Sequence, residues 1–154
     1  MGIIFNICNF SAPDQCPERI IVQIQDKKII NDEVEVGLKD ANSIYKQIHN
    51  DPICEKTNHS CWVTYGGLSK AWAIWYCVGP NGTWKGWCIG RRSSLGTYWG
   101  GIFYSETTAH AQSICPSTIN MDWEYTANNV SGSLTHFKLI DAEDWKWNKG
   151  KGLF

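Results

Sequence analysis

Apolar residues alternate with polar ones, or form short apolar runs between turns, along most of the 154-residue chain. Runs of four to eight residues that are rich in β-branched and aromatic side chains are typical of β-strands. The densest region spans residues 71–104, where apolar runs at 71–78 and 83–89 flank the turn sequence Gly79-Pro80-Asn81-Gly82. This arrangement predicts a β-hairpin.

A turn centred on Pro80-Asn81 would place Trp75 opposite Gly86 and Cys77 opposite Trp84. Side chains alternate across a strand, so both faces of the first hairpin strand carry large apolar groups. Such a strand is either central in a packed fold or an edge that shows aromatic rings to a ligand, and the sequence alone leaves both open. One face holds Trp72, Ile74, Tyr76 and Val78, and the other holds Ala73, Trp75 and Cys77.

The same patterns predict further strands and one helix. A short helix is expected after Asp40 or Asn42, with Ile44 and Ile48 on one side, ending before Asn50. The strands 20–25 and 34–38 are expected to pair with each other. Loops are expected at 11–17, 53–60 and 105–118, and 141–154 is either a docked arm or a frayed tail. The other expected strands are 2–10, 62–65, 96–104, 122–125 and 133–140.

Many short strands between turns predict an all-β chain, a single-domain antiparallel β-sandwich over residues 1–154 with one short helix and long loops. Charge adds little. The formal net charge is −1, and the single Arg-Arg pair, Arg91-Arg92, is too small for a nucleic-acid footprint. Nine tryptophans, against a charged fraction of only 19%, suit a protein that presents aromatic rings.

The seven cysteines include no Cys-x-x-Cys pair and no zinc-finger spacing with histidine, so we expect disulfides and no metal site. Disulfides predict an oxidising compartment and a secreted or extracellular protein. A Cys8–Cys16 bridge would close the proline-containing loop between them, and the odd count leaves at least one thiol over. The disulfide candidates are Cys8, Cys16, Cys54, Cys61, Cys77, Cys88 and Cys115.

Asn-x-Ser/Thr sequons at Asn9, Asn58, Asn81 and Asn129 lean mildly towards the same compartment. The sequence has no run long enough for a transmembrane helix. The opening MGIIFNICNF is too short and too uncharged for a complete signal peptide. We therefore expect either a leader replaced by Met1 or another route of export.

Residues with catalytic potential are scattered. No serine lies in a Gly-x-Ser-x-Gly elbow, and the four histidines fall in four different segments. A nucleophilic pair of Cys115 with His110 or His136 is far less favoured than a disulfide. Glu124, between Trp123 and Tyr125, is the acid to check, although an outward-facing residue is the favoured interpretation. The sequence therefore predicts a protein that is not an enzyme and needs no cofactor.

The aromatic residues carry the stronger signal. Tryptophan and tyrosine rings stack on sugars and also settle among lipid headgroups. Nine indoles are hard to bury in one small domain, so some are expected at the surface, beside the hairpin turn, the Arg-Arg loop and the terminal segment. The predicted ligand-binding residues are Trp84, Trp87, Trp99, Arg91, Arg92, Trp145 and Trp147.

Three fragments resemble those of the aegerolysins, small β-sandwich proteins that bind membrane lipids. The resemblance implies a sandwich that recognises a lipid headgroup with aromatics, often beside a larger pore-forming partner, and it does not imply catalysis. The chain departs from the family in its many cysteines and its charged aromatic tail. The fragments are the opening run 3–9, then Gly90-Arg91-Arg92-Ser93-Ser94-Leu95-Gly96-Thr97 with Gly100 and Phe103, and Trp123-Glu124-Tyr125 leading to Ser131-Gly132-Ser133-Leu134.

The first hypothesis is therefore a secreted, toxin-like or effector-like protein that docks aromatic side chains on membrane lipid headgroups of a target cell, with Arg91 and Arg92 facing phosphate or sulfate. A carbohydrate-binding lectin that uses the same rings is the first alternative. A protein-binding effector or inhibitor is the second, and a small hydrolase is the least favoured.

Overall fold

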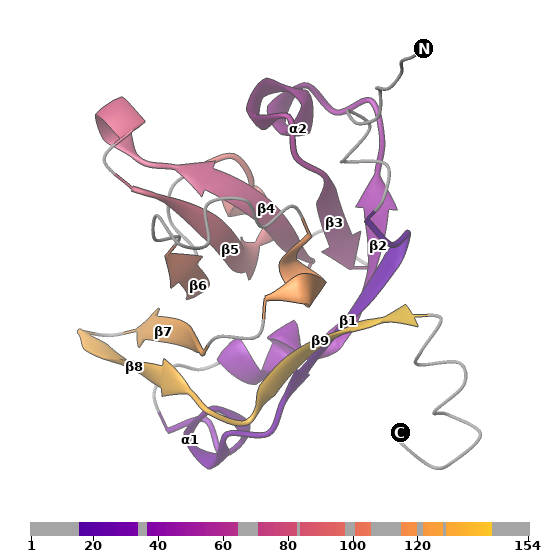
Figure 1. Cartoon of the computed structure of the whole chain (residues 1–154). Coiled ribbons are helices and arrows are strands. Elements are labelled where there is room, and N and C mark those ends of the chain that lie inside the picture. Colours follow the sequence, from indigo (N-terminus) through magenta and orange to yellow (C-terminus); the bar gives the residue numbers. More distant parts are fainter. Residues whose placement is uncertain are drawn as a thin grey trace.

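The computed structural model describes residues 16–33, 37–64, 71–82, 84–97, 101–105, 115–119, 122–127 and 129–142. Within these ranges nine strands form one antiparallel sheet (Figure 1). The strands are β1 (Arg19–Ile24), β2 (Ser43–Ile48), β3 (Cys61–Thr64), β4 (Trp72–Val78), β5 (Lys85–Arg91), β6 (Ile102–Ser105), β7 (Trp123–Ala127), β8 (Val130–Leu134) and β9 (Phe137–Asp141). The helical segments are α1 (Lys27–Ile30), α2 (Pro52–Thr57) and the 3-10 turns η2 (Leu38–Ala41), η4 (Pro80–Gly82), η5 (Arg92–Ser94) and η7 (Pro116–Thr118).

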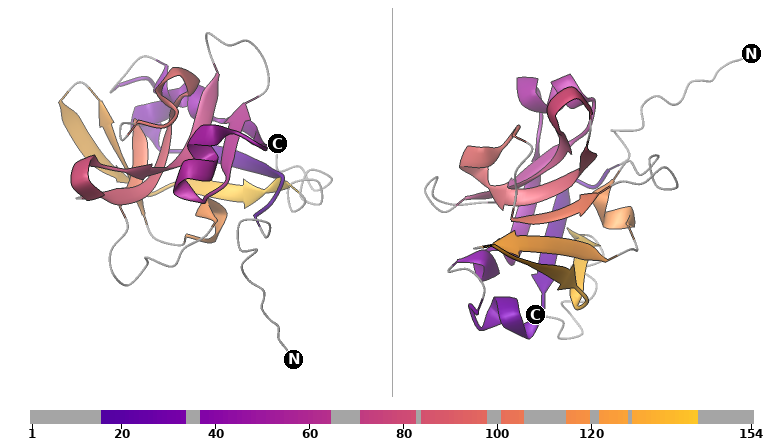
Figure 2. Two further views of the ribbon diagram at one scale, coloured as in Figure 1. Left: turned by 90° about the horizontal axis from the view of Figure 1, so that it is seen from above. Right: turned by 90° about the vertical axis from the view of Figure 1, so that its left-hand side faces the viewer.

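The sheet follows the chain almost strand by strand. Its order is β8-β7-β6-β5-β4-β3-β2-β1-β9, so each of the first eight strands lies beside its neighbours in sequence and β9 returns to pair with β1. The two edge strands, β8 and β9, are joined by Thr135 and His136 alone. The sheet therefore curls until its edges meet at this link (Figures 1 and 2). An all-β, antiparallel fold is confirmed.

The carboxylate of Asp26 holds the link between the two edges. It accepts hydrogen bonds from the backbone N–H groups of Thr135 at 3.0 Å and His136 at 3.1 Å. The backbone N–H of Gln25 donates to the carbonyl oxygen of His136 at 2.7 Å. These bonds satisfy backbone groups that the end of a sheet would otherwise leave unpaired.

Apolar side chains pack on both faces of the sheet. The larger group, which we call the inner core, takes Trp72, Ile74 and Tyr76 from β4. The smaller group, the outer cluster, takes Ala73, Trp75 and Cys77 from the opposite face of the same strand. The predicted alternation is confirmed, and β4 is a central strand between β3 and β5. The inner core comprises Cys16, Ile20, Val22, Ile24, Ile29, Leu38, Ala41, Tyr45, Trp62, Trp72, Ile74, Tyr76, Trp87, Ile89, Ile102, Tyr104, Cys115, Trp123, Tyr125 and Leu134.

The predicted β4–β5 hairpin is present with a different register. Trp75 lies opposite Cys88 and Cys77 lies opposite Gly86, not opposite Gly86 and Trp84 as expected. The turn centres on Asn81 and Gly82, which both take left-handed backbone conformations with φ of 58° and 69°. These residue types tolerate such angles, whereas proline cannot adopt them, and this moves the centre of the turn one residue along the chain.

The segment around residues 34–48 differs from its prediction. Residues 34–36 lie outside the described ranges, but a pairing of 20–25 with 34–38 is wrong because β2 and β9 occupy both edges of β1. The predicted helix after Asp40 or Asn42 is also wrong, since Ser43–Ile48 is the strand β2. Asn42 binds the backbone N–H and carbonyl of Ile24 instead of capping a helix. Burial of Tyr45 and Gln47 with Lys46 exposed shows the period of two that a strand requires.

Three other segments differ from their predictions in type or in extent. The helix of this region lies in the expected loop 53–60, where Asp51 caps α2 and Pro52 takes its first turn. The expected strand 133–140 is divided by the Thr135–His136 link into the end of β8 and β9. Of the expected strand 96–104, residues 102–104 lie in β6, residues 96–97 are not in a strand, and residues 98–100 lie outside the described ranges. The expected strand 2–10 and residues 143–154 of the terminal segment lie outside the described residues.

Three disulfides cross-link the chain, namely Cys16–Cys115, Cys54–Cys61 and Cys77–Cys88. The candidate Cys8–Cys16 bridge is excluded because Cys16 is bonded to Cys115, 99 residues away. Cys16 precedes β1, and η7, which follows Cys115, packs against β9, the neighbour of β1. Sheet topology therefore determines this pairing. The bridges indicate an oxidising, extracellular type of environment, and no helix in the described ranges is long and apolar enough to cross a membrane.

Candidate functional site

The structure separates the tryptophans that were predicted to share a surface. Trp87 is completely buried in the inner core, where its ring lies 5.4 Å from that of Tyr76. Trp84 lies on the opposite face, half-buried, with its indole N–H donating to Ser105 Oγ at 2.6 Å. The expectation that Trp87 is exposed is wrong, because the curl of the sheet turns its face of β5 inward. Trp84 and Trp87 therefore do not form one patch.

The two arginines are half-buried near one end of β5. The guanidinium carbon of Arg91 lies 4.8 Å above the centre of the Trp72 ring, a cation–π contact at the margin of the inner core. A Cβ atom on Gly37 would come within 2.7 Å of Arg91 Nη2, so the loop before η2 packs closely on this side chain. Arg92 begins η5. Trp99, Trp145 and Trp147 lie outside the described residues.

A cleft of about 730 Å³ lies between α2 and the turn end of the β4–β5 hairpin. The sequence pattern does not predict this cleft, because residues 53–60 have the polar composition of a loop. The signal for α2 was the Asp51-Pro52 pair, an N-cap residue followed by a proline in the first turn. The residues that line the cleft are Ile53, Lys56 and Thr57 from α2, His59 after it, Tyr76 and Val78 from β4, Lys85 from β5, and Leu95, Gly96 and Thr97 after η5.

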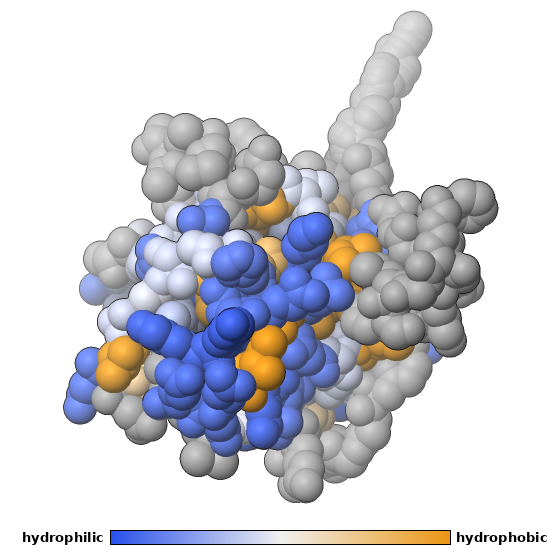
Figure 3. All heavy atoms as spheres, turned by 90° about the horizontal axis from the view of Figure 1, so that it is seen from below, coloured by the Kyte–Doolittle hydropathy of each residue, from blue (hydrophilic) through white to orange (hydrophobic). Residues whose placement is uncertain are grey.

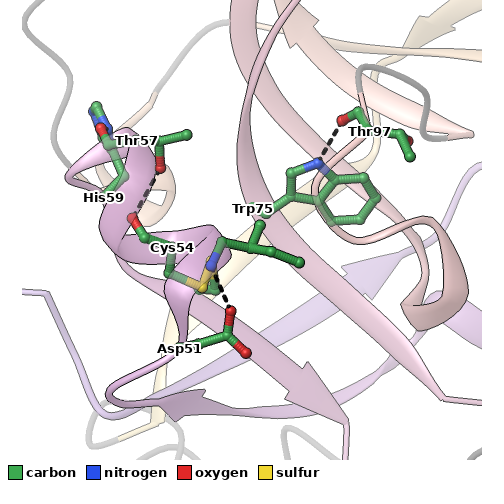
Figure 4. Close-up of a disulfide and its surroundings, with 8 residues drawn as sticks. Asp51, Cys54, Thr57, His59, Trp75 and Thr97 are labelled. Atoms are coloured by element: carbon green, nitrogen blue, oxygen red, sulfur yellow. Dashed lines mark hydrogen bonds between the residues drawn. A yellow bond between two sulfur atoms is a disulfide. The ribbon is translucent and has the colours of Figure 1, made fainter.

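Local bonds hold the α2 wall of the cleft. Asp51 Oδ1 accepts from the N–H of Ile53 at 2.9 Å, and Thr57 Oγ1 donates to the carbonyl of Cys54 at 3.1 Å (Figure 4). Asn58 ends the helix in a left-handed conformation with φ of 60°. A six-residue helix is too short to be stable alone. The Cys54–Cys61 disulfide links α2 to β3 and so stabilises a helix that is too short to be stable alone.

The segment after η5 also lines the cleft, and a residue of the outer cluster holds it in place. The indole N–H of Trp75 donates to the carbonyl oxygen of Thr97 at 2.8 Å (Figure 4). The two walls meet where Ile53 packs against Gly96, because a Cβ on this glycine would lie 2.9 Å from Ile53 Cγ2. Gly96 has φ of 93°, a backbone angle that residues with a side chain rarely adopt. The cleft therefore depends on a helix and a turn that are each fastened to the sheet.

The lining combines apolar, uncharged polar and cationic side chains. Ile53 and Val78 expose 40% and 43% of their surfaces, and both are among the few large hydrophobic side chains that the described residues expose. Lys56 and Lys85, one from each bordering element, are the only Lys, Arg, Asp or Glu residues among the described residues that line the cleft. By contrast, the face in Figure 3 is mainly hydrophilic with small separate apolar spots. An apolar wall with two cations and no carboxylate favours an anionic ligand.

His59 lies where α2 approaches the inner core. Its ring stacks on Tyr76, with centroids 3.8 Å apart and planes 8° from parallel, and meets Trp87 edge-on at 5.5 Å. Nδ1 is 2.7 Å from the carbonyl oxygen of Thr57, which only accepts, so Nδ1 carries the hydrogen. Burial lowers the pKa of His59, and the Thr57 hydrogen bond opposes this only in part. The ring is therefore neutral at pH 7.

Other titratable groups do not assemble into a reactive cluster in the described part of the chain. No group of three or more His, Cys, Asp or Glu residues there is placed to hold a metal ion. Cys115 is bonded to Cys16 and so is not available as a nucleophile. Glu124 is exposed on β7 between the buried Trp123 and Tyr125, facing outward as expected. His49 pairs with Glu18 at 3.0 Å on the surface.

Comparison of the chain with protein-family models, with curated proteins and with solved structures gives no match. The resemblance to the aegerolysins therefore remains a prediction from three sequence fragments. The cleft, and not a family, is the basis for assigning a function.

Proposed function

We propose that the protein is a secreted, disulfide-stabilised binding protein that recognises anionic membrane-lipid headgroups on a target cell, in the manner of a toxin or effector. The observation that carries this proposal is the cleft between α2 and the β4–β5 hairpin, in which exposed Ile53 and Val78 lie with Lys56 and Lys85, and none of the described lining residues is a carboxylate. Lipid headgroups joined to acyl chains present the complementary combination of negative charge and apolar surface.

The expected strength of binding follows from these groups. A lysine near an anionic membrane surface contributes about 1 kcal/mol, so the pair supplies roughly 2 kcal/mol. Ile53 and Val78 add apolar burial at about 25 cal/mol for each Å² removed from water. Neither contribution is large alone. Binding should therefore require both charge and apolar contact, and it should weaken in high salt.

The proposal changes the residues that were predicted to bind. Lys56, Lys85, Ile53 and Val78 replace Trp87, which is buried. Arg91 is held on Trp72 and is given no direct part. The roles of Trp99, Trp145 and Trp147 stay predictions. We also keep the β-sandwich as a proposal, in which two halves of the curled sheet face each other across the inner core.

Liposome co-sedimentation tests the function. The wild-type protein should pellet with phosphatidylcholine vesicles that contain an anionic lipid and should stay in solution with phosphatidylcholine alone. The double variant Lys56→Gln/Lys85→Gln should lose most of this binding. The matched control is Lys27→Gln/Lys28→Gln, which removes the same charge from the two exposed lysines of α1.

Three outcomes would overturn the proposal. They are no binding to any vesicle, equal losses in the two double variants, and binding to a glycan array in place of lipids. The last result would support the lectin alternative. Capture of a specific protein by the wild type but not by the cleft variant, without lipid binding, would support a protein-binding effector.

A further inference from the structure

The first inference concerns which headgroup the cleft selects, and it rests on the proposed function. His59 lines the cleft with one ring face covered by Tyr76. Its Nδ1–H is used by the Thr57 carbonyl. In the neutral ring the other nitrogen, Nε2, carries a lone pair and accepts hydrogen bonds. No described residue donates to Nε2, so it is available to a ligand.

Few headgroups satisfy both an acceptor at His59 and two lysines. Choline has no hydrogen-bond donor. Ethanolamine and serine donate through an ammonium group, which Lys56 and Lys85 repel. Glycerol and inositol headgroups donate through uncharged hydroxyls and carry a phosphate for the lysines. We propose that the cleft selects lipids whose headgroup combines a phosphate with a free hydroxyl, and that His59 is the residue that determines this specificity.

Vesicles of equal surface charge test the selection. Phosphatidylglycerol, phosphatidylinositol and phosphatidylserine each carry one net negative charge, so equal fractions in phosphatidylcholine differ only in headgroup chemistry. At pH 7 the wild type should bind the two hydroxyl-bearing lipids roughly five- to tenfold more tightly than phosphatidylserine, which is the worth of about one hydrogen bond.

His59→Phe keeps a ring to stack on Tyr76 and removes the acceptor. It should bind all three anionic vesicles about equally, at the level that the wild type shows for phosphatidylserine. The matched control, His49→Phe, changes an exposed histidine that does not line this cleft and should keep the preference. Near-ultraviolet circular dichroism checks that each variant is folded.

The outcomes separate the two proposals. Equal wild-type binding to the three anionic lipids would overturn the selectivity and leave the proposed function standing. An unchanged preference in His59→Phe would overturn the role of this residue. No binding to any vesicle would overturn the proposed function itself.

A separate observation concerns the sequons. Asn58, Asn81 and Asn129 are all exposed, and each has a left-handed backbone, with φ of 60°, 58° and 67°. They lie at the end of α2, in the β4–β5 turn and in the β7–β8 turn. A glycan at such a point extends into solvent without disturbing a packed side chain. The structure assigns these three asparagines as N-glycosylation sites of the secreted protein.

Asn50 is the internal control, because it is exposed with φ of 61° but lies in no sequon. The full chain behind a secretory leader is expressed in eukaryotic cells and its peptides are examined by mass spectrometry before and after glycosidase treatment. Glycan should be found at Asn58, Asn81 and Asn129 and not at Asn50. Absence of glycan from all three sites in secreted, disulfide-bonded protein would overturn the assignment.

Discussion

The two faces of the central strands β4 and β5 are stabilised differently. The inner core is closed by the curl of the sheet and filled with large rings, among them Trp62, Trp87 and Trp123. The outer cluster is smaller and contains the disulfides Cys54–Cys61 and Cys77–Cys88. The cleft beside α2 borders both groups, since it is lined by Tyr76 of the inner core and by Leu95, which packs on the outer cluster. Aromatic packing thus maintains the fold, while covalent links hold the short elements that form the candidate site.

The largest expected effect comes from breaking the inner core. Trp87→Ala should lower the free energy of unfolding by about 3–5 kcal/mol, because a fully buried ring leaves a cavity. Trp84→Ala, at a half-buried position on the outer face, should cost distinctly less. Trp87→Phe should also cost less than the alanine, since no described residue accepts from the buried indole N–H. Denaturant unfolding measures all three, and equal losses at positions 84 and 87 would contradict the distinction between the faces.

An intermediate effect is expected from removing the Cys54–Cys61 disulfide, which fastens α2 to β3. The variant Cys54→Ser/Cys61→Ser should lose roughly 2 kcal/mol of stability, because the bridge closes only a short loop. Binding to anionic vesicles should fall much further, since α2 supplies one wall of the cleft. Denaturant unfolding and co-sedimentation on the same samples compare the two losses. Full binding in a folded, doubly substituted protein would show that the disulfide does not maintain the site.

The smallest effect is a dependence of stability on pH that arises from His59. Its pKa is lowered in the folded protein, mainly by burial, so the unfolded chain binds the proton more readily. Its contribution to stability is present above the ordinary histidine pKa of 6.5 and is lost as the pH falls towards the lowered value.

The thermal midpoint of the wild type should therefore fall further than that of His59→Phe on acidification through this window. Lys56 and Lys85 line the cleft with His59, and His49, Asp51 and Glu55 line a second pocket that His59 also borders. Because His49 is a second histidine that lines a pocket bordered by His59, His49→Phe is the necessary comparison. If the pH dependence of the thermal midpoint changes in His49→Phe and not in His59→Phe, His59 is not its source.

Local patterns were sufficient wherever a structural property depends on neighbours in sequence. The alternation on β4 predicted which side chains share a face, and Gly79 to Gly82 correctly marked a turn. They failed at residues 43–48, where Ile44 and Ile48 fit a helix as well as a strand. Pairing with β1 and β3 decided for the strand. The candidate site was missed for a similar reason, since α2 is too short to produce a helical period.

The sequence by itself determined that this chain is all-β, that it forms disulfides and that β4 is apolar on both faces. Only the tertiary structure decided which face is interior, which cysteines meet and where the cleft lies. The physical reason is that a period of two separates the sides of a strand but carries no information about the direction in which the sheet curls. That direction buries Trp87, leaves Trp84 on the outer side, and brings Cys16 to Cys115 across 99 residues.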